Sequence, residues 1–306
     1  LTPEKVKQAA AEVREGLSFC LSMQLDMPGG NAVNPKRFPP KFGPVFHNGE
    51  HYYNFDWTAL HPGMMDITSD EWVTLYSQYS TQWDSLAHVG CLFDADADGE
   101  PEPLYYNGYR AGEDVGGPKA STSNIVDMGA KALGIENMAQ TGVQGRGVMV
   151  DFQRHFSDER VAVGYDMLMK VFEKDGIVVE KGDMFLFHTG LDEMILSMGG
   201  KPDAKKLHAS CAVLDGFDDK LLQWITDSGI TVIASDNMGI EDTHNVAVTA
   251  DGRSRLPIHR HCLFRLGVHL GEIWYLSELA RALRERGRFR FLLTPPPLRM
   301  PGAVGS

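Results

Sequence analysis

The stretch on which the fold prediction depends reads QYSTQWDSLAH and runs from Gln78 to His88. Its polar residues Gln78, Gln82, Asp84 and His88 stand at even positions, and alternate side chains of an extended chain point to one face. Gln82 and Asp84 would lie within about 7 Å of each other, so they could share one cation. Gln78 would lie roughly 13 Å from Gln82, so a common site requires a bend at the Ser-Thr pair between them. A polar row on a strand is also typical of a solvated face.

A second group of candidate ligands lies towards the C-terminus. The chain reads Pro-Ile-His-Arg-His at residues 257–261 and Gly-Glu at residues 271–272. Imidazole and carboxylate ligands together suit Zn, Mn and similar divalent ions. His261 and His269 can equally be ordinary surface or core histidines, so this group does not by itself decide for a metal site.

Two further patterns have simpler interpretations. Asp94, Asp96 and Asp98 resemble the start of a calcium-binding EF-hand loop, but the twelfth position is Tyr105, where a bidentate Glu is needed. We therefore interpret them as a solvated acidic turn. Cys91 could suggest a thiol nucleophile, yet no pattern that would orient a base accompanies it, and we interpret it as an inert cysteine.

The composition excludes several classes of protein. The chain has 306 residues, of which 43% are hydrophobic and 23% charged, and this argues against disorder. Its 29 basic and 41 acidic residues give a net charge of −12, which disfavours nucleic acid as a partner. No apolar run approaches the roughly 18 residues of a membrane span, so no membrane partner is expected. The four cysteines are scattered, which predicts reduced thiols and a cytoplasmic location.

Hydrophobic periodicity predicts a mixture of helices and strands without a strict βαβ rhythm. Helices are expected at four segments with helical spacing of apolar residues: 3–17, 157–174, 220–227 and 273–286. Strands are expected at three compact apolar runs: 184–188, 230–234 and 289–293. Residues 72–89 are expected to be extended. No Gly-x-Gly-x-x-Gly follows a strand, so dinucleotide binding has little support.

Residues 1–65 are expected to form a loop-rich N-terminal extension. After the opening helix, residues 27–62 carry many prolines, glycines and aromatic residues, a composition that breaks regular structure. Long ordered loops are often functional. This segment is therefore expected either to act as a lid or subunit contact, or to pad the surface.

Together, these segments resemble the cyclase-type metal-dependent hydrolases, the family that includes bacterial kynurenine formamidase, isatin hydrolase and trans-dienelactone hydrolase. The family motif is H-x-G-T-H-x-D-x-x-x-H, which Thr81, Asp84 and His88 match. Gln78 and Gln82 stand in place of its two histidines, a Q-x-x-x-Q variant that is most similar to trans-dienelactone hydrolase. Further matches follow in order, and the resemblance covers residues 70–306: Gly182, Asp183, Thr189, Gly190, Ser235, Asp236, Asn237, Glu241, Pro257–His259, Gly271, Glu272, Pro297, Leu298, Pro301 and Gly302.

The resemblance implies a mixed α/β fold with the swivelling β/β/α arrangement of the cyclases, and a divalent metal ion that activates water. The metal ligands that it implies are Gln78, Gln82, Asp84, His259 and Glu272. An amide oxygen is neutral and is a weaker ligand than imidazole for Zn or Mn. We therefore expect one ion per chain, Zn or Mn, rather than two.

The implied chemistry is attack of activated water on a lactone or amide carbonyl. His88 is expected to move protons, because its unperturbed pKa lies near physiological pH, and Glu272 could act as a base if one of its oxygens stays free. Trp83, Tyr105 and Tyr106 are expected to wall a substrate pocket, although aromatic residues also fill cores.

The expected partner is a small-molecule substrate, and the chain is expected to form a homo-oligomer, either a dimer or a tetramer. The matching blocks place one continuous catalytic domain at residues 66–306, after the extension at residues 1–65. The alternative is a non-catalytic small-molecule binding or scaffold protein on the same fold, with a metal site degraded by the loss of the two histidines.

Overall fold

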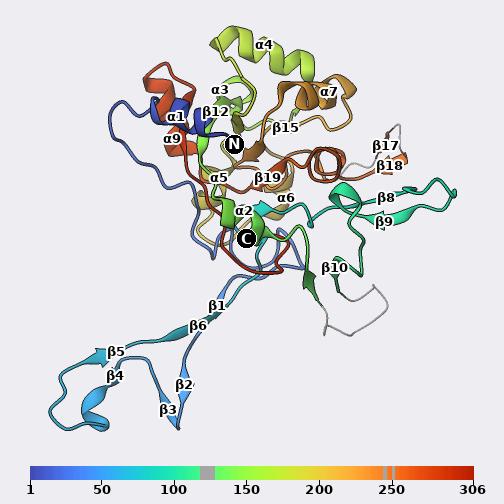
Figure 1. The fold of residues 1–306 in the computed structure, drawn as a ribbon. Helices are drawn as coiled ribbons and strands as arrows, with labels where there is room; N and C mark the ends of the chain where they lie inside the picture. Colours follow the sequence, from blue (N-terminus) through green and yellow to red (C-terminus); the bar gives the residue numbers. More distant parts are fainter. Residues whose placement is uncertain (118–127, 244–246, 250–251) are drawn as a thin grey trace.

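A mixed six-stranded sheet forms the centre of the protein (Figure 1). The computed structural model describes residues 1–117, 128–243, 247–249 and 252–306. The strands are, in order across the sheet, β20 (Arg290–Leu293), β12 (Gly145–Asp151), β14 (Met184–His188), β16 (Val232–Ser235), β19 (His269–Glu272) and β7 (Gln82–Asp84). The four inner strands are parallel, and β20 and β7 pair with them antiparallel at the two edges. This mixed sheet confirms the predicted mixed α/β fold class of the protein.

Alternation of side chains along the inner strands builds two apolar cores, one on each face of the sheet. In β14, Phe185 and Phe187 belong to one core, while Met184 and Leu186 belong to the other, and all four are fully buried. The strands β12 and β16 continue this alternation. A strand buried on both faces reads as a continuous apolar run, which is why the prediction of a strand at residues 184–188 is confirmed.

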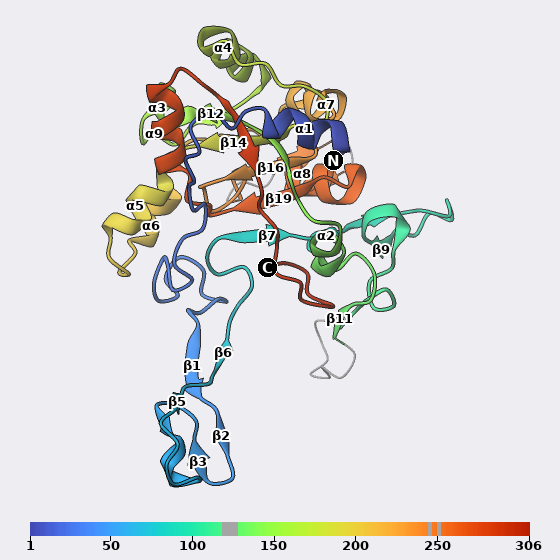
Figure 2. The ribbon, with the colours of Figure 1, turned by 60° about the vertical axis from the view of Figure 1, so that its left-hand side comes forward.

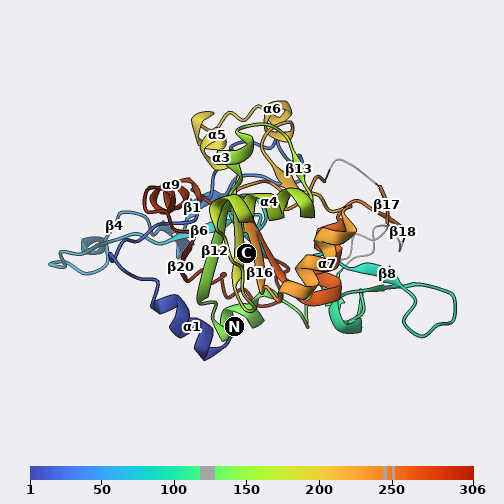
Figure 3. The same cartoon turned by 90° about the horizontal axis from the view of Figure 1, so that it is seen from above.

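Helices pack on both cores. On the Phe185 face lie α4 (Tyr165–Asp175) and α7 (Asp219–Ser228); seen from above, α4 lies across the strands and α7 lies beside them (Figure 3). On the other face, α2 (Ile135–Thr141) and α9 (Ser277–Glu285) bury apolar residues in the second core. Among the described residues, no helix has the length and apolar character needed to cross a membrane.

One carboxylate fixes the first turns of both α4 and α7. Asp218 is the N-cap of α7 and accepts hydrogen bonds from the backbone N–H groups of Lys220 and Leu221. It also accepts a 2.7 Å hydrogen bond from the backbone N–H of Tyr165, the first residue of α4. A Cβ atom at Gly164 would stand 2.5 Å from the Asp218 carboxylate, so this close approach requires glycine.

The helix at the N-terminus, α1 (Pro3–Ala10), is tied to the sheet by buried ion pairs. Lys5 Nζ lies 2.9 Å from Asp183 Oδ1, and Arg146 Nε lies 2.8 Å from the same oxygen. Asp183 is fully buried at the start of β14. Separation of Lys5 from Asp183 would leave a buried charge without its partner, which is costly. These ion pairs therefore hold α1 in place against the sheet.

The remaining elements are short. The other helices are α3 (Phe152–Phe156), α5 (Leu191–Ser197), α6 (Ala204–His208), α8 (Pro257–His259), the 3-10 helices η1 (Trp57–Ala59) and η2 (Tyr106–Gly108), and the π-helix η3 (Arg260–Leu266). Two-stranded pairs are β8 (Cys91–Phe93) with β9 (Glu102–Leu104), β10 (Val115–Gly116) with β11 (Gly129–Ala130), β13 (Ala162–Val163) with β15 (Val213–Leu214), and β17 (Ala247–Thr249) with β18 (Gly252–Ser254).

Residues 41–74 form an arm that projects away from the body (Figures 1 and 2). It consists of the antiparallel pairs β1 (Lys41–Pro44) with β6 (Glu71–Thr74), β2 (Phe46–His47) with β3 (Glu50–His51), and β4 (Phe55–Asp56) with β5 (Ile67–Thr68). Several of its apolar side chains are exposed, among them Phe42, Phe46 and Ile67. The extension predicted as loop-rich therefore contains paired strands, and its division from the rest of the chain at residue 65 stays a prediction.

The boundaries of two predicted helices at the chain ends were wrong. The opening helix ends at Ala10 rather than near residue 17, and Val13 and Leu17, beyond its end, are largely exposed. The last helix begins at Ser277 rather than at Ile273. The backbone N–H groups of Ile273 and Trp274 instead bond to the carbonyls of Asn237 and Ser235, and Ile273 has a left-handed backbone conformation that a helix does not allow.

The helix expected at residues 157–174 begins only at Tyr165. Residues 162–163 form β13 instead, because they pair with β15, a segment about fifty residues further along the chain. The extended segment expected at residues 72–89 contains two short strands, β6 and β7, separated by a turn. The inner strands β12 and β19 were missed, and with them the parallel order of the sheet.

We expect Phe185→Ala to lower the free energy of unfolding by about 4 kcal/mol, because the ring is fully buried and packs edge-on against Trp224 and Phe172. Urea denaturation of both proteins measures this difference. Val178→Ala, at an exposed position, is the control and should change the free energy by about 0.5 kcal/mol or less. Equal stability of the two variants would contradict the packing described for β14.

Candidate metal centre

The candidate centre begins at the edge of the sheet, where β7 pairs with β19. The antiparallel register places Gln82 directly opposite Glu272 and Asp84 opposite Leu270. Cross-strand partners share a face of a sheet, so the side chains of Gln82, Asp84 and Glu272 lie together, while Trp83 turns into the opposite core. All three polar residues are buried. Gln82 Nε2 donates a 2.6 Å hydrogen bond to Glu272 Oε2.

His259 reaches this cluster from the short helix α8. The carboxylate of Glu241 accepts hydrogen bonds from the backbone N–H groups of Ile258 and His259 and lies 2.9 Å from His259 Nδ1. This arrangement turns His259 Nε2 towards the two carboxylates, 3.1 Å from Glu272 Oε1 and 3.5 Å from Asp84 Oδ2. A carboxylate on the far nitrogen is the usual partner of a metal-binding histidine, because it fixes the ring and leaves Nε2 as the ligand atom.

Four buried oxygens in this cluster have no hydrogen-bond partner: Gln82 Oε1, Asp84 Oδ1, Asp84 Oδ2 and Glu272 Oε1. His259 Nε2 approaches the last of these without hydrogen-bond geometry. Buried acceptors without a donor are costly. One imidazole nitrogen and several oxygens that converge on one point are a donor set that fits Zn or Mn. The ligand atoms of Asp84, His259 and Glu272 lie within 4.8 Å of one another, so the cluster could hold one ion.

The charges of the cluster perturb one another. Burial and the neighbouring Asp84 charge raise the pKa of Glu272 above its ordinary value. Burial also opposes the ionisation of Asp84, but the positive charges of His88, His259 and Arg37 hold its pKa below the ordinary value. The pKa of His259 is raised well above its usual range despite its burial, because Glu241, Asp84 and Glu272 surround it. Without a metal ion, a proton on His259 therefore supplies the positive charge that these carboxylates need.

The structure brings four of the five predicted ligands together, and His88 lies beside them. His88 follows β7 in a turn, is partly exposed, and places Nε2 3.6 Å from Asp84 Oδ1. Gln78 lies in the turn before β7, where its amide nitrogen packs against Gly305 and has no hydrogen-bond partner. The bend expected near Ser80 is present, but no hydrogen bond joins Gln78 to the cluster within the described residues. The roles of these residues as ligands and catalysts stay predictions.

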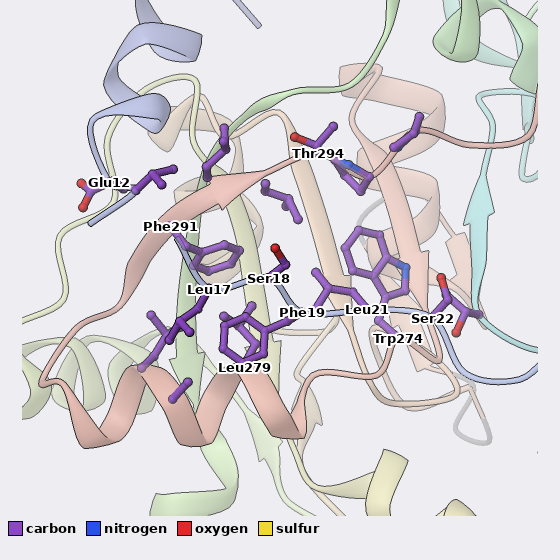
Figure 4. Close-up of a pocket in the computed structure, with 18 of the residues that line it drawn as sticks. Glu12, Leu17, Ser18, Phe19, Leu21, Ser22, Trp274, Leu279, Phe291 and Thr294 are labelled. Carbon is purple, nitrogen blue, oxygen red and sulfur yellow. The ribbon is translucent and has the colours of Figure 1, made fainter. Parts of the chain in front are cut away.

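The aromatic residues expected in a substrate pocket lie in different places. Trp83 lines a groove of about 740 Å³ between the N-terminal segment, β20 and α9. Figure 4 shows this groove, with Leu17, Phe19, Trp274 and Phe291 along its walls. Tyr105 packs against Ala87 and Val115 instead, and neither Tyr105 nor Tyr106 lines the groove. Gln82 borders this groove but Asp84, His259 and Glu272 do not, so its large volume does not mark the candidate metal centre.

A second buried cluster lies at the carboxyl ends of β12, β14 and β16. His188 Nδ1 lies 2.9 Å from Asp151 Oδ1, and His188 Nε2 lies 2.9 Å from the Ser277 hydroxyl. Asp192 accepts a 2.6 Å hydrogen bond from this hydroxyl and bonds from the backbone N–H groups of Leu276 and Ser277. Asp236 accepts bonds from the backbone N–H groups of residues 189 and 190.

His188, Asp192 and Asp236 are close enough to bind a metal ion, but their hydrogen bonds distinguish them from the first cluster. Every carboxylate oxygen of Asp192 and Asp236 accepts a hydrogen bond. The donors include backbone N–H groups at the starts of α5 and α9, so these carboxylates stabilise the starts of both helices. Burial and the nearby Asp192 raise the pKa of Asp236 to about 7. Burial lowers the pKa of His188, but Asp151, Asp236 and Asp192 outweigh it and raise that pKa overall.

Sequence reasoning did not assign this second cluster. Asp236 appeared only as one of the matching family residues, and His188 only as the end of a predicted strand. The sequence did contain a signal for this cluster: a polar residue stands at or directly after the end of a buried strand. The carboxyl ends of parallel strands lie at the same edge of a sheet, so such residues are expected to lie close together.

The third group of acidic residues, Asp94, Asp96 and Asp98, lies in the exposed tip of the β8–β9 hairpin. Its carboxylates accept hydrogen bonds from the backbone N–H groups of residues 98, 99 and 100. These contacts are those of a solvated acidic turn.

The fold and the buried histidine–carboxylate cluster define a mixed α/β protein with a candidate metal centre, and comparison with known proteins identifies its family. Residues 21–242 match the family model described as "Putative cyclase", and the chain belongs to this family. This confirms the family and the cyclase-like fold predicted from the motif blocks. None of the curated proteins matches the chain.

Solved structures share the fold. A novel cyclase is 28% identical, with a TM-score of 0.72, and the match covers 100% of this chain and 89% of that one. Isatin hydrolase A from Ralstonia solanacearum is 15% identical, with a TM-score of 0.57, over 100% of this chain and 95% of that one. An isatin hydrolase bound to the product analogue thioisatinate is 11% identical, with a TM-score of 0.56, over 100% and 96%.

We expect His188→Gln to destabilise the protein by about 3 kcal/mol at pH 6 and by less at pH 9. Because the folded state raises the pKa of His188, this contribution to stability is complete below the unfolded pKa of about 6.5 and is lost as pH rises through the folded value. Urea denaturation of both proteins across this pH range measures the difference. Val178→Ala, at an exposed position, is the control and should change the stability by about 0.5 kcal/mol or less at every pH. A constant cost for His188→Gln would exclude a charged His188.

Proposed function

We propose that this protein is a metal-dependent hydrolase that uses one divalent ion, Zn or Mn, to open a lactone or amide bond with water. The observation that carries this proposal is the set of four unpartnered buried oxygens, of which Glu272 Oε1 and Asp84 Oδ2 lie 3.1 and 3.5 Å from His259 Nε2. Asp84, His259 and Glu272 would hold the ion, and Gln82 could add its free amide oxygen. The isatin hydrolases have this fold, which supports a small cyclic substrate.

A divalent ion in this position would supply Lewis acidity, which lowers the pKa of water and polarises a substrate carbonyl. The chain itself orients the ligands. Gln82 holds Glu272 Oε2 through its amide hydrogen, so only Oε1 of that carboxylate is free to face the ion. Glu241 in turn keeps His259 Nε2 aimed at the same point. This arrangement favours a single ion, because the amide nitrogen of Gln82 is bound to Glu272 and only the amide oxygen is left to bind metal.

His88 is the proposed proton carrier. Its ring lies beside Asp84 but is partly exposed, so it can exchange protons with water while it faces the centre. Glu272 is the other predicted base, and its raised pKa favours taking a proton, but it would first have to free Oε2 from Gln82 or Oε1 from the ion. Lactone and amide hydrolysis need the same activated water. We therefore propose that the bond opened is either a lactone or an amide bond.

The second candidate is a non-catalytic small-molecule binding protein on the same fold. The observation that favours it is the presence of Gln78 and Gln82 where the family motif has histidines. In that case the proton on His259 would permanently take the place of the metal ion.

Metal analysis and a substrate panel separate the two candidates. We expect protein purified without chelator to contain about one Zn or Mn ion per chain and to hydrolyse at least one compound from a panel of lactones, N-formyl amides and cyclic imides. Glu272→Gln should bind metal less well and lose most turnover, while Glu278→Gln on α9 serves as the control. A wild-type chain without ion and without hydrolysis would establish the binding protein instead.

We also propose that two or more copies of the chain associate through the arm of residues 41–74. Its strands are two to four residues long, too short to be stable alone, and Phe42, Phe46 and Ile67 are all at least 61% exposed. A second copy of the same arm would cover these side chains and stabilise the strands.

Light scattering tests this association. We expect the wild-type chain to have the mass of a dimer or a tetramer, and the double variant Phe42→Glu, Phe46→Glu to be a monomer, because each new charge would be buried in the interface. Leu92→Glu, at an equally exposed position on the β8–β9 hairpin, should not change the mass. A wild-type monomer at micromolar concentration would contradict the proposal.

A further inference from the structure

The residue that follows Glu272 has a strained backbone. Ile273 has a φ of 56°, in the left-handed region, which is rare for a β-branched residue because its side chain crowds the backbone there. Such a conformation persists only where the surrounding contacts impose it, and it is most often found at functional sites. The contacts that impose it here also bear on the position of Glu272, the candidate metal ligand directly before it.

Three contacts hold Ile273 in this conformation. Its backbone N–H donates a 2.9 Å hydrogen bond to the carbonyl of Asn237, in the segment that continues from β16. Its carbonyl accepts a 2.6 Å hydrogen bond from the hydroxyl of Thr81, the residue directly before β7. Its side chain is buried in an apolar cluster that also contains Met23 of the N-terminal extension. Both polar groups of this strained residue therefore have partners from distant parts of the chain.

Thr81 joins three parts of the chain through one hydroxyl group. The hydroxyl donates to the carbonyl of Ile273 and accepts a 2.9 Å hydrogen bond from the backbone N–H of Met23. Along the chain, Thr81 directly precedes Gln82, which stands opposite Glu272 in the register of β7 against β19. One hydroxyl group therefore links the residue before Gln82 to the residue after Glu272.

The neighbouring Ser80 makes a different contact. Its hydroxyl donates a 2.9 Å hydrogen bond to the carbonyl of Gln24, so it also fastens the N-terminal extension. Among the described residues, no hydrogen bond joins this hydroxyl to β19 or to the residues that follow it. Thr81 is therefore bonded both to the extension and to the end of β19, whereas Ser80 is bonded only to the extension.

The alignment of the two strands decides which oxygen of Glu272 is open. Gln82 Nε2 occupies Glu272 Oε2 at 2.6 Å and leaves Oε1 without a partner. A shift of Glu272 along the strand would lengthen this short bond and turn Oε1 away from His259. Groups that orient metal ligands without touching the ion typically change metal affinity by about 10- to 100-fold when they are mutated.

We propose that Thr81 is a positioning residue of the metal centre: its hydroxyl holds Ile273 in the strained conformation and thereby aligns Glu272 with Gln82. The role towards the ion rests on the proposed function, but the alignment of the two strands does not. The competing explanation is that Thr81 only fastens the N-terminal extension, as Ser80 does.

Zinc titration of the full chain by calorimetry separates these explanations. Thr81→Val keeps the size of the side chain without its hydroxyl, Thr81→Ser keeps the hydroxyl, and Ser80→Ala removes only the neighbouring contact. We expect Thr81→Val to raise the Kd for zinc about tenfold or more, and the other two variants to stay within about threefold of the wild type. An unchanged Kd in Thr81→Val, an equal loss in Ser80→Ala, or no rescue by Thr81→Ser would overturn the proposal.

Hydrogen exchange of the metal-free proteins distinguishes this proposal from the proposed function. We expect residues 269–276 to exchange about fivefold faster or more in Thr81→Val, and at the wild-type rate in Thr81→Ser and Ser80→Ala, because only the first variant leaves the Ile273 carbonyl without its donor. Circular dichroism checks that each variant is folded, and Thr81→Ala replaces Thr81→Val if that variant is not.

Unchanged exchange in the variant without the hydroxyl would overturn the alignment by Thr81. A wild type that binds no zinc, together with the expected pattern of exchange, would argue against the metal-dependent hydrolase and leave the alignment of the strands intact.

Discussion

The burial of Asp84 and Glu272 side by side, at the edge of the sheet, is the constraint on which the rest of the structure depends. Two carboxylates that face each other without hydrogen-bond donors on three of their oxygens would repel, and each unpartnered atom costs free energy. Such a pair persists only with a positive charge between its members. The register of β7 against β19, the orientation of His259 and the Gln82–Glu272 hydrogen bond all converge on that one point.

One short segment connects this point to the interior of the protein. Residues 235–241 run on from the last residue of β16. Asp236 near their start belongs to the His188 cluster, whereas Glu241 at their end holds His259. The backbone N–H groups of Ile273 and Trp274, directly after Glu272, bond to carbonyls of the same segment. A Cβ at Gly271 would stand 2.7 Å from the Trp274 indole, whose N–H donates to the Gln82 carbonyl, so the strand needs glycine there. The two clusters thus share a rigid connection.

The N-terminal extension is held by the turn that leads into β7. The sheet supplies two carboxylates and an amide to the centre and α8 supplies an imidazole, all suited to a cation. The extension is positioned by side chains of the turn before β7, and its Arg37 donates to the carbonyl of Gln78. The arm that continues from it exposes apolar residues, which suits association better than padding.

The sequence alone determined the family, the strands at residues 184–188 and 230–234, and the shared face of Gln82 and Asp84, because apolar runs, side-chain alternation and motif spacing are local properties. The tertiary structure decided the rest. Tyr165 begins α4 because Asp218 caps it from 53 residues away, and Gln82 meets Glu272 across 190 residues. The saturation of the His188 cluster and the open oxygens of the Asp84 cluster are likewise differences in contacts between distant residues. Spacing along a chain carries no information about such contacts, since only packing determines which polar atoms find a partner.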